Sequence, residues 1–153
     1  MGTHNDGTEF EDFVRATEPR LRRALIGCRG VDVAQEAVAE ALAYAWEHWT
    51  EVQALANPAG YLFRVGQSRT RRRATPQLPS PESLRIPDIE PALIPALLAL
   101  PERQRSAVWL VHACGWTYAE AAAGLGISAS AVGTHVGRAL ERLRRDLEVE
   151  TRA

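Results

Sequence analysis

The sequence contains no lysine, a single methionine and only two cysteines among its 153 residues. Cys28 and Cys114 lie far apart and lack the CxxC spacing of a metal or redox site, so we expect reduced, structural thiols. No apolar run approaches the roughly 20 residues that a membrane span requires, and the opening MGTHNDGTEFED is polar and acidic, unlike a signal peptide. We therefore expect a cytoplasmic protein with no membrane span, no metal and no cofactor.

Motifs for catalysis are absent as well. The histidines are scattered, there is no glycine-rich phosphate loop, and no nucleophile stands beside a base and an orienting partner in a recognisable motif. We expect no catalytic residue, and the sequence predicts that the chain is not an enzyme.

Positive charge is unevenly distributed, although the formal net charge is only −1. All 18 basic residues are arginine, which either reflects genome composition or serves the forked recognition of phosphates. The arginines gather in two helical segments, while acidic residues remain available for a protein partner. The two clusters are Arg64, Arg69, Arg71, Arg72 and Arg73, and Arg138, Arg142, Arg144 and Arg145.

Prolines divide the chain into two parts. Seven of the nine prolines lie between Pro76 and Pro101, in a stretch that has no sustained hydrophobic period. We expect a linker at residues 75–90, between a helical domain at residues 8–74 and a second domain at residues 91–149. Because helical periods dominate and no strand pattern occurs, the predicted fold class is all-α.

Apolar residues recur at spacings of three and four, as on the buried side of helices. Asn57 and Pro58 begin one helix, with Leu62 and Val65 facing inward, and residues 91–100 and 101–113 predict two more. The expected core includes Phe10, Phe13, Val14, Leu21, Ala24 and Leu25, then Ala37, Val38, Ala41, Leu42, Ala45 and Trp46, and finally Val108, Trp109 and Val111.

Residues 116–145 predict two helices joined by a tight turn. Thr117 and Glu120 form a capping box at the start of the first helix, and Gly126 supplies a left-handed turn. Ser128 or Ser130 caps the second helix, whose apolar stripe is Val132, Val136, Leu140 and Leu143. This pattern is typical of a helix-turn-helix that places its second helix in the major groove of DNA.

A helical hairpin of this kind is also an ordinary packing unit. The side opposite the apolar stripe favours the DNA interpretation, because its residues are small or hydrogen-bonding rather than rich in glutamate. These residues are Ser130, Gly133, Thr134, His135, Gly137, Arg138 and Arg142.

The run from Leu100 to Arg144 resembles the second conserved domain of small bacterial sigma factors of the extracytoplasmic-function group. Its start carries Leu100, Pro101, Arg103, Gln104 and Arg105. The first half agrees: Phe10 to Leu25, then DVAQEAVAEALAYAWEHW, then NPAGYLFRVGQSRTRRR resemble the first conserved domain in order, spacing and aromatic placement. The resemblance covers nearly the whole chain outside the linker and the termini.

This resemblance implies a sigma factor that directs RNA polymerase core to specific promoters, recognises their −10 and −35 elements and opens the strands. The helix from Asp32 to Trp49 is expected to dock on the clamp helices of the largest polymerase subunit, and the second domain on the flap of the second subunit. An anti-sigma protein is a further expected partner. The residues implied in polymerase binding are Asp32, Gln35, Glu36 and Glu40.

The resemblance also assigns the DNA contacts. For the −10 element it implies Arg64, Gln67, Ser68 and Arg69 at bases or backbone, and Arg71, Arg72 and Arg73 at phosphates. For the −35 element it implies Thr117, Tyr118, Ser130, Gly133, Thr134, His135, Arg138 and Arg142. Tyr61 and Phe63 cannot both stack on bases, because helical positions two apart diverge, and we expect Tyr61 in the core.

Several positions depart from the family pattern. Ala39 replaces a usual glutamine and Ala43 a commonly basic residue on the polymerase side, while Gly133 and Ser68 replace a frequent lysine and a common asparagine on the DNA side. Weaker core binding is one consequence. Two alternatives therefore stay open at this point: a stand-alone helix-turn-helix regulator, and a sigma-like adaptor without initiation activity.

Overall fold

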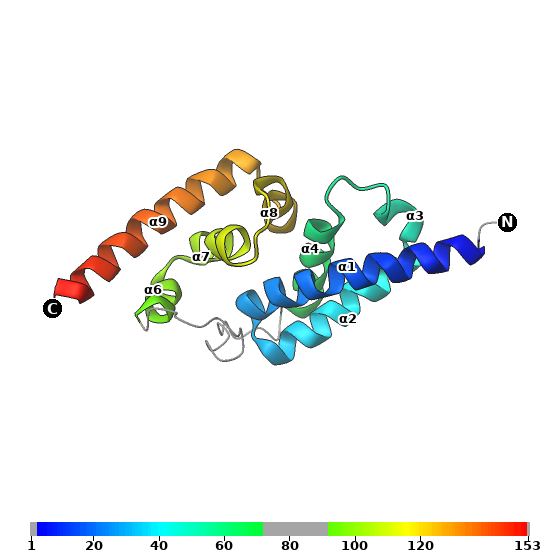
Figure 1. The fold of residues 1–153 in the computed structure, drawn as a ribbon, viewed down its shortest axis with the longest axis horizontal. Helices are drawn as coiled ribbons and strands as arrows, with labels where there is room; N and C mark the ends of the chain where they lie inside the picture. The colour runs from blue at the N-terminus through cyan, green and yellow to red at the C-terminus, as the bar shows by residue number, and fades with distance from the viewer. Residues whose placement is uncertain (1–2, 72–91, 153) are drawn as a thin grey trace.

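The computed structural model describes residues 3–71 and 92–152 (Figure 1), and side chains within 5–71 and 92–148. We call these ranges the N-terminal half and the C-terminal half. The predicted linker at residues 75–90 lies outside the described residues, as do Arg72 and Arg73, so the domain boundaries stay a prediction. All regular structure in the described ranges is helical, which confirms the all-α prediction.

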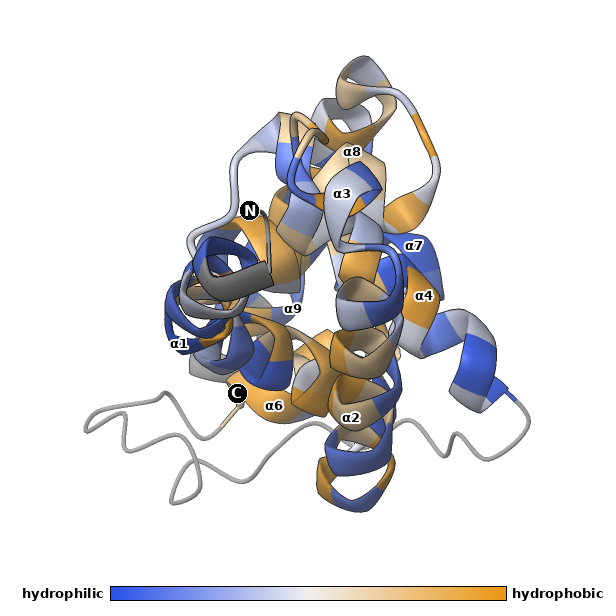
Figure 2. Cartoon of the chain, turned by 90° about the vertical axis from the view of Figure 1, so that its right-hand side faces the viewer, coloured by the Kyte–Doolittle hydropathy of each residue, from blue (hydrophilic) through white to orange (hydrophobic). Residues whose placement is uncertain are grey.

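The N-terminal half consists of α1 (Thr3–Arg29), α2 (Val31–Glu47), α3 (Trp49–Val52) and α4 (Pro58–Thr70). Gly30 alone separates α1 from α2, and its φ of 82° is one that residues with a side chain rarely adopt. The chain can therefore reverse at once, and α2 packs against both α1 and α4. Leu21, Leu25 and Leu62 are fully buried between these helices, whereas hydrophilic residues dominate the outer side of α1 (Figure 2).

An aromatic cluster closes one end of this half. The ring of Phe10 lies 4.9 Å from that of Trp46 and 5.2 Å from that of Trp49, and Phe13 lies 5.1 Å from Trp49. The prediction that Trp46 belongs to the core is wrong, because Trp46 is 54% exposed while Trp49 is only 9% exposed. The reason is that α2 ends at Glu47, and the turn into α3 directs Trp49 inward instead.

The C-terminal half consists of α6 (Leu93–Ala99), α7 (Glu102–Val108), the π-helical turn η2 (Trp109–Ala113), α8 (Tyr118–Leu125) and α9 (Ala129–Arg152). The helices predicted at residues 91–100 and 101–113 are confirmed, the second continuing from α7 into η2. Leu97, Leu100 and Val108 pack against Ala139 and Leu143 of α9 in a core of their own.

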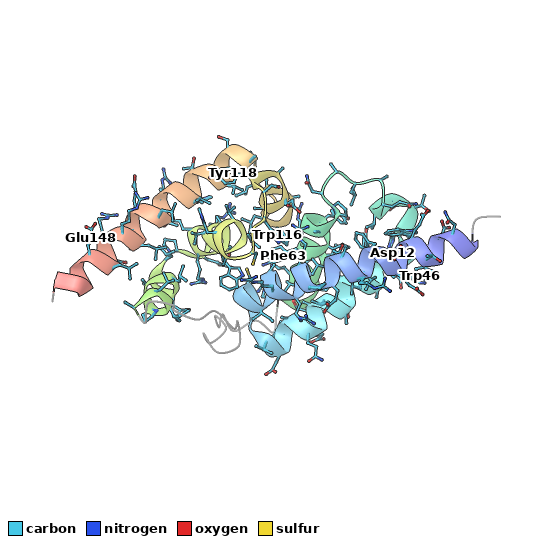
Figure 3. The ribbon with its side chains drawn as sticks, in the orientation of Figure 1. Asp12, Trp46, Phe63, Trp116, Tyr118 and Glu148 are labelled. Carbon is cyan, nitrogen blue, oxygen red and sulfur yellow. The ribbon has the colours of Figure 1, made fainter. Side chains whose placement is uncertain are left out.

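The two halves are in direct contact through α4 and α8. Phe63 of α4 is fully buried, and its ring meets Trp116 edge-on at a centroid distance of 5.4 Å where the halves join (Figure 3). Gly60 and Gly124 allow this approach, since a Cβ on Gly60 would lie 2.4 Å from the backbone oxygen of Glu120. The main core cluster therefore runs through both halves, a contact that the proline pattern did not predict.

Candidate nucleic-acid interface

The helix-turn-helix forms as its sequence predicts. The Thr117 hydroxyl accepts a hydrogen bond from the Glu120 amide at 3.1 Å, and the Glu120 carboxylate accepts one from the Thr117 amide at 3.2 Å, which completes the capping box. Gly126 ends α8 with a φ of 67°. Ser128 then accepts a hydrogen bond from the Ala131 amide at 3.0 Å and caps α9. These local interactions fix the angle at which α9 leaves the turn.

One side of α9 is buried and the opposite side is free. Val132, Val136, Ala139 and Leu143 point into the protein. We call the free side the recognition surface, and it consists of Ser130, Thr134, Gly137, Arg138 and Arg142, all exposed. Glu141, three residues after Arg138, is exposed on the same side, so the surface offers hydroxyl and guanidinium groups to a ligand beside one carboxylate.

The edges of the recognition surface differ from the expectation in two places. Gly133 lies beneath the Tyr118 ring, because a Cβ there would meet Tyr118 Cε2 at 3.3 Å. Tyr118 is 45% exposed and stands at the junction of α8 and α9 (Figure 3). His135 is half-buried, and its Nδ1 is buried without a hydrogen-bond partner among the described residues. The glycine therefore seats Tyr118, and His135 turns one ring edge inward.

A second surface lies in the N-terminal half, on α2 and α4. An open cleft of about 410 Å³ is lined by Tyr44, Tyr61, Arg64, Val65, Ser68 and Arg69, and we call it the tyrosine cleft. Three residues that were predicted to contact the −10 element, Arg64, Ser68 and Arg69, come together here.

The tyrosine cleft is held by polar contacts between its walls. The hydroxyls of Tyr44 and Tyr61 are 3.1 Å apart, and this hydrogen bond is the main reason why the pKa of Tyr44 is raised. Arg69 lies over the Tyr44 ring at 5.5 Å and donates a hydrogen bond to Glu40 at 3.0 Å. The His48 ring stacks on Tyr44 at 4.1 Å. The cleft therefore combines π-faces with fixed positive charge.

Sequence reasoning missed the two tyrosines of this cleft. Tyr61 was expected in the core, but it is half-buried at the cleft, and Phe63 occupies the core position instead. A phenol hydroxyl needs a polar partner, so tyrosine rather than phenylalanine at positions 44 and 61 was the available signal.

The residues expected to bind polymerase do not share one environment. Asp32 and Gln35 are exposed and continue into a stripe with Ala39, Ala43 and Trp46, which we call the α2 stripe. Glu36 is half-buried. Glu40 instead pairs with Arg69 of the tyrosine cleft, so the structure joins residues that were predicted for two different surfaces.

Gln67 and Arg71 were predicted to lie with the other −10 residues, but they face another part of the molecule. They line cavities between the two halves, together with Arg29, Glu102 and Ser106. Arg64 reaches toward the same contact, since its guanidinium carbon would lie 3.3 Å from a Cβ on Gly126. The predicted −10 residues therefore divide between the tyrosine cleft and the junction of the halves.

The junction also contains an ion pair. Arg20 of α1 donates to the Glu120 carboxylate at 2.6 Å and lies 5.6 Å over the Trp116 ring. Burial alone would raise the pKa of Glu120, but hydrogen bonds from Arg20 and from the Thr117 amide hold that pKa below its ordinary value. Glu120 thus serves the capping box of α8 and the contact between the halves at once.

The described residues contain no helix long and apolar enough to cross a membrane. Within the same residues, no group of three or more His, Cys, Asp or Glu side chains is placed to hold a metal ion.

Comparison with known proteins places these surfaces in context. The family described as sigma-70, region 4, matches residues 92–143. The RNA polymerase sigma-E factor of Streptomyces antibioticus is 33% identical over an alignment of 153 residues, which covers 92% of this chain and 85% of that protein. The sigma-E factor of Streptomyces avermitilis is 32% identical over 162 residues, covering 95% and 88% respectively.

Two solved structures are similar in fold, each at 24% identity. The sigma factor RpoE of Bartonella quintana, solved with the anti-sigma factor NepR, has a TM-score of 0.66 over 92% of this chain and 98% of that one. CnrH, solved with the cytosolic domain of CnrY, has a TM-score of 0.65 over 92% and 88%.

Proposed function

The chain belongs to the extracytoplasmic-function sigma factors of bacterial RNA polymerase, and from this premise we propose how its surfaces divide the work of starting transcription. As a sigma factor it directs core polymerase to promoters, and sigma factors are not a class of enzyme. The observation that carries the proposal is that one chain bears two separate exposed surfaces with arginine, the recognition surface on α9 and the tyrosine cleft on α2 and α4.

The recognition surface reads the −35 element in the major groove. The outward Ser130, Thr134 and Arg138 approach base edges, because hydroxyl and guanidinium groups match the donors and acceptors exposed there. Arg142, one turn further along α9, neutralises a phosphate. Thr117 and Tyr118 reach the backbone beside the groove. Gly133 contributes by seating Tyr118, and His135 by its outward ring edge.

The tyrosine cleft receives an unstacked base of the −10 element. Tyr61 offers ring surface beside Tyr44, whose own ring is stacked on His48, and stacking of a base on an aromatic side chain contributes about 1–3 kcal/mol. Arg64, Ser68 and Arg69 contact the backbone or base edges beside it. Glu40 then acts as a positioning residue for Arg69 rather than as a polymerase contact. Capture of an extruded base offsets the cost of unpairing it, which is how this half contributes to strand opening.

The α2 stripe binds the clamp helices of the largest polymerase subunit. Its polar end, with the carboxylate of Asp32 and the amide of Gln35, meets basic polymerase side chains and increases the rate of encounter. Its other end is apolar, with Ala39, Ala43 and the exposed Trp46. Loss of polar groups at Ala39 and Ala43 is thereby compensated in part by apolar contact. The C-terminal half binds the flap of the second subunit, and the protein acts in the cytoplasm, with the polymerase and the promoter.

Contact with both elements requires the two halves to separate. The −10 and −35 elements are about 25 base pairs apart, or roughly 85 Å of duplex at about 3.4 Å per base pair. Halves that pack α4 directly against α8 cannot span this length. A chain of twenty residues, the length between the two halves, spans at most about 70 Å when fully extended, and the halves themselves supply the rest of the distance. An anti-sigma protein that holds the halves together would therefore silence the chain.

Run-off transcription with core polymerase tests the proposal. We expect the purified chain to confer transcription on a template selected from a promoter library, and scrambling of either element to abolish it. Permanganate reactivity of thymines in the −10 element reports strand opening in the same reactions. Binding of the chain to duplex without transcription would favour a stand-alone regulator, and polymerase binding without thymine reactivity would favour an adaptor; either result contradicts the proposal. The family assignment does not favour these alternatives.

A further inference from the structure

A cavity rich in arginine lies at the junction of the two halves and is not used by the function proposed above. It consists of two adjoining chambers of about 200 Å³ and about 480 Å³, which share Arg29, Gln67 and Arg71. Arg105 lines the smaller chamber, Arg103 the larger, and Glu102 both. We call this the arginine cavity. Its four arginines against one glutamate leave a formal charge of +3.

Among the described residues, no ion pair neutralises three of the four arginines that line the arginine cavity. No ion pair within the described ranges involves Arg29, Arg71 or Arg103. Arg29 is half-buried, and its Nε is buried without a hydrogen-bond partner there. Guanidinium groups that share a partly enclosed space repel one another. A buried donor without a hydrogen-bond partner has lost its hydration without a compensating interaction. Both features are relieved by a bound anion.

The Cys28 thiol senses the same positive potential. Burial raises the pKa of Cys28 to about 11, and it does so against an opposing hydrogen bond with Ser106 and the charges of Arg29 and Arg105. Cys28, Ser106, Arg29 and Arg105 all line the smaller chamber, so the arginines act on groups in its wall.

We infer that the arginine cavity binds a small phosphorylated molecule of nucleotide size, which bridges the two halves of the chain. Arg29 and Arg71 come from the N-terminal half and Arg103 and Arg105 from the C-terminal half, so one polyphosphate group contacts both. Forked guanidinium groups match phosphate oxygens in pairs.

The dimensions and the walls favour a nucleoside polyphosphate over a lone phosphate ion. The smaller chamber takes a phosphate between Arg29, Arg71 and Arg105. The larger chamber falls in the size range of small-molecule sites, and Leu125 and Ile127 provide apolar wall for a base or sugar there. Since the cavity exists only while the halves are packed together, the bound ligand stabilises the packed arrangement.

Calorimetric titration of the full chain at low salt tests the inference with inorganic phosphate, pyrophosphate, ADP and adenosine as probes. We expect one-to-one binding of ADP, weaker binding of pyrophosphate and phosphate, and none of adenosine. Arg29→Gln and Arg103→Gln, one in each half, should each weaken ADP binding by about tenfold, the cost of one charged hydrogen bond. Glu102→Gln should tighten it, because a negative charge leaves the cavity.

Arg144→Gln provides the matched control, because it removes an exposed arginine of α9 that does not line the cavity. Misfolding would weaken binding, so the tighter binding expected of Glu102→Gln cannot be explained by misfolding. The inference is overturned if neither ADP nor pyrophosphate binds at about 1 mM, if Arg144→Gln weakens binding as much as Arg29→Gln, or if only one half contributes. These outcomes are independent of promoter recognition, since no DNA or polymerase is present.

Discussion

Single side chains carry two of the expectations that can be checked most simply, and the first concerns the cysteines. Desolvation is the largest contribution that raises the pKa of Cys28, to about 11, and the pKa of Cys114, to about 12. Thiolate is the reactive form, so both thiols should react slowly with an alkylating reagent near pH 8 and rapidly once the chain is unfolded in urea.

The same pKa values predict that the folded chain becomes less stable at alkaline pH. The unfolded chain loses its thiol protons near pH 9 while the folded chain keeps them, so the free energy of unfolding should fall as the pH rises above about 9. Denaturant titrations between pH 8 and 10 measure this, and a Cys114→Ala variant should show a smaller fall. Equal alkylation rates in the folded and unfolded chain would contradict the raised pKa values of both thiols.

The second expectation at this scale concerns Arg138. If it contacts a base edge of the −35 element, Arg138→Gln should weaken binding to the preferred sequence by about 1–3 kcal/mol and relax selectivity at one position. Arg144→Gln removes the same charge from a different side of α9 and should weaken binding to all sequences alike and only slightly. Fluorescence anisotropy with matched and mutated −35 duplexes measures both. Equal losses for the two variants would remove Arg138 from base recognition.

At the scale of helices, Gly60 offers a way to oppose the contact between the halves without damaging either. The three atoms nearest to a methyl group there all belong to α8, with the Glu120 oxygen at 2.4 Å, and alanine favours helix over glycine by about 1 kcal/mol in α4 itself. Gly60→Ala should therefore leave the helix content unchanged and expand the chain, as measured by circular dichroism and small-angle X-ray scattering.

Two other glycines provide controls for that variant. A Cβ on Gly137 would meet nothing within 4 Å, so Gly137→Ala should leave the scattering unchanged. A Cβ on Gly66 would lie 2.9 Å from the Ala37 oxygen inside the N-terminal half, so Gly66→Ala should destabilise that half itself. Identical scattering of Gly60→Ala and the native chain would show that the α4–α8 contact tolerates a methyl group.

Elements whose signals are local were predictable from the sequence. The capping box at Thr117 and the left-handed Gly126 depend on residues within one or two turns, and both are confirmed. Of the two serines predicted as alternative caps of α9, Ser128 is the one that caps it. Positions decided by packing were not predictable. The choice between Trp46 and Trp49 for the core depends on where α2 ends. The choice between Tyr61 and Phe63 depends on which residues of α8 lie opposite α4. Helical periodicity predicts neither.

At the scale of the whole molecule, the contact between the halves was beyond sequence reasoning. The arginine clusters indicated nucleic acid, but no pattern linked Arg20 to Glu120, 100 residues apart, or moved Gln67 and Arg71 away from the tyrosine cleft. Such contacts depend on how the two halves are placed relative to each other, and the sequence pattern within one half does not determine that placement. The residues assigned to DNA and polymerase therefore remain predictions, supported by exposure and grouping.

The ion pair at the junction predicts how acid affects the packed arrangement. Since the pKa of Glu120 is lowered in the folded chain, its contribution is complete above the ordinary value of 4.5 and is lost as the pH falls through the lowered pKa. Scattering between pH 6 and 3 should show expansion over that range. Arg20→Gln removes the ion pair but keeps the capping box of α8, so the expansion in acid should be smaller in this variant. An unchanged pH profile would exclude the ion pair as the cause of the expansion.

The central claim is that this sigma factor is packed when alone and opens to span a promoter. Energy transfer between dyes on Ala16→Cys and Ala119→Cys tests it most directly, because these exposed positions lie one turn from Arg20 and one residue from Glu120, which are in contact. We predict strong transfer in the free chain and its loss when core polymerase and promoter DNA are added. Equal transfer in both states would contradict the claim.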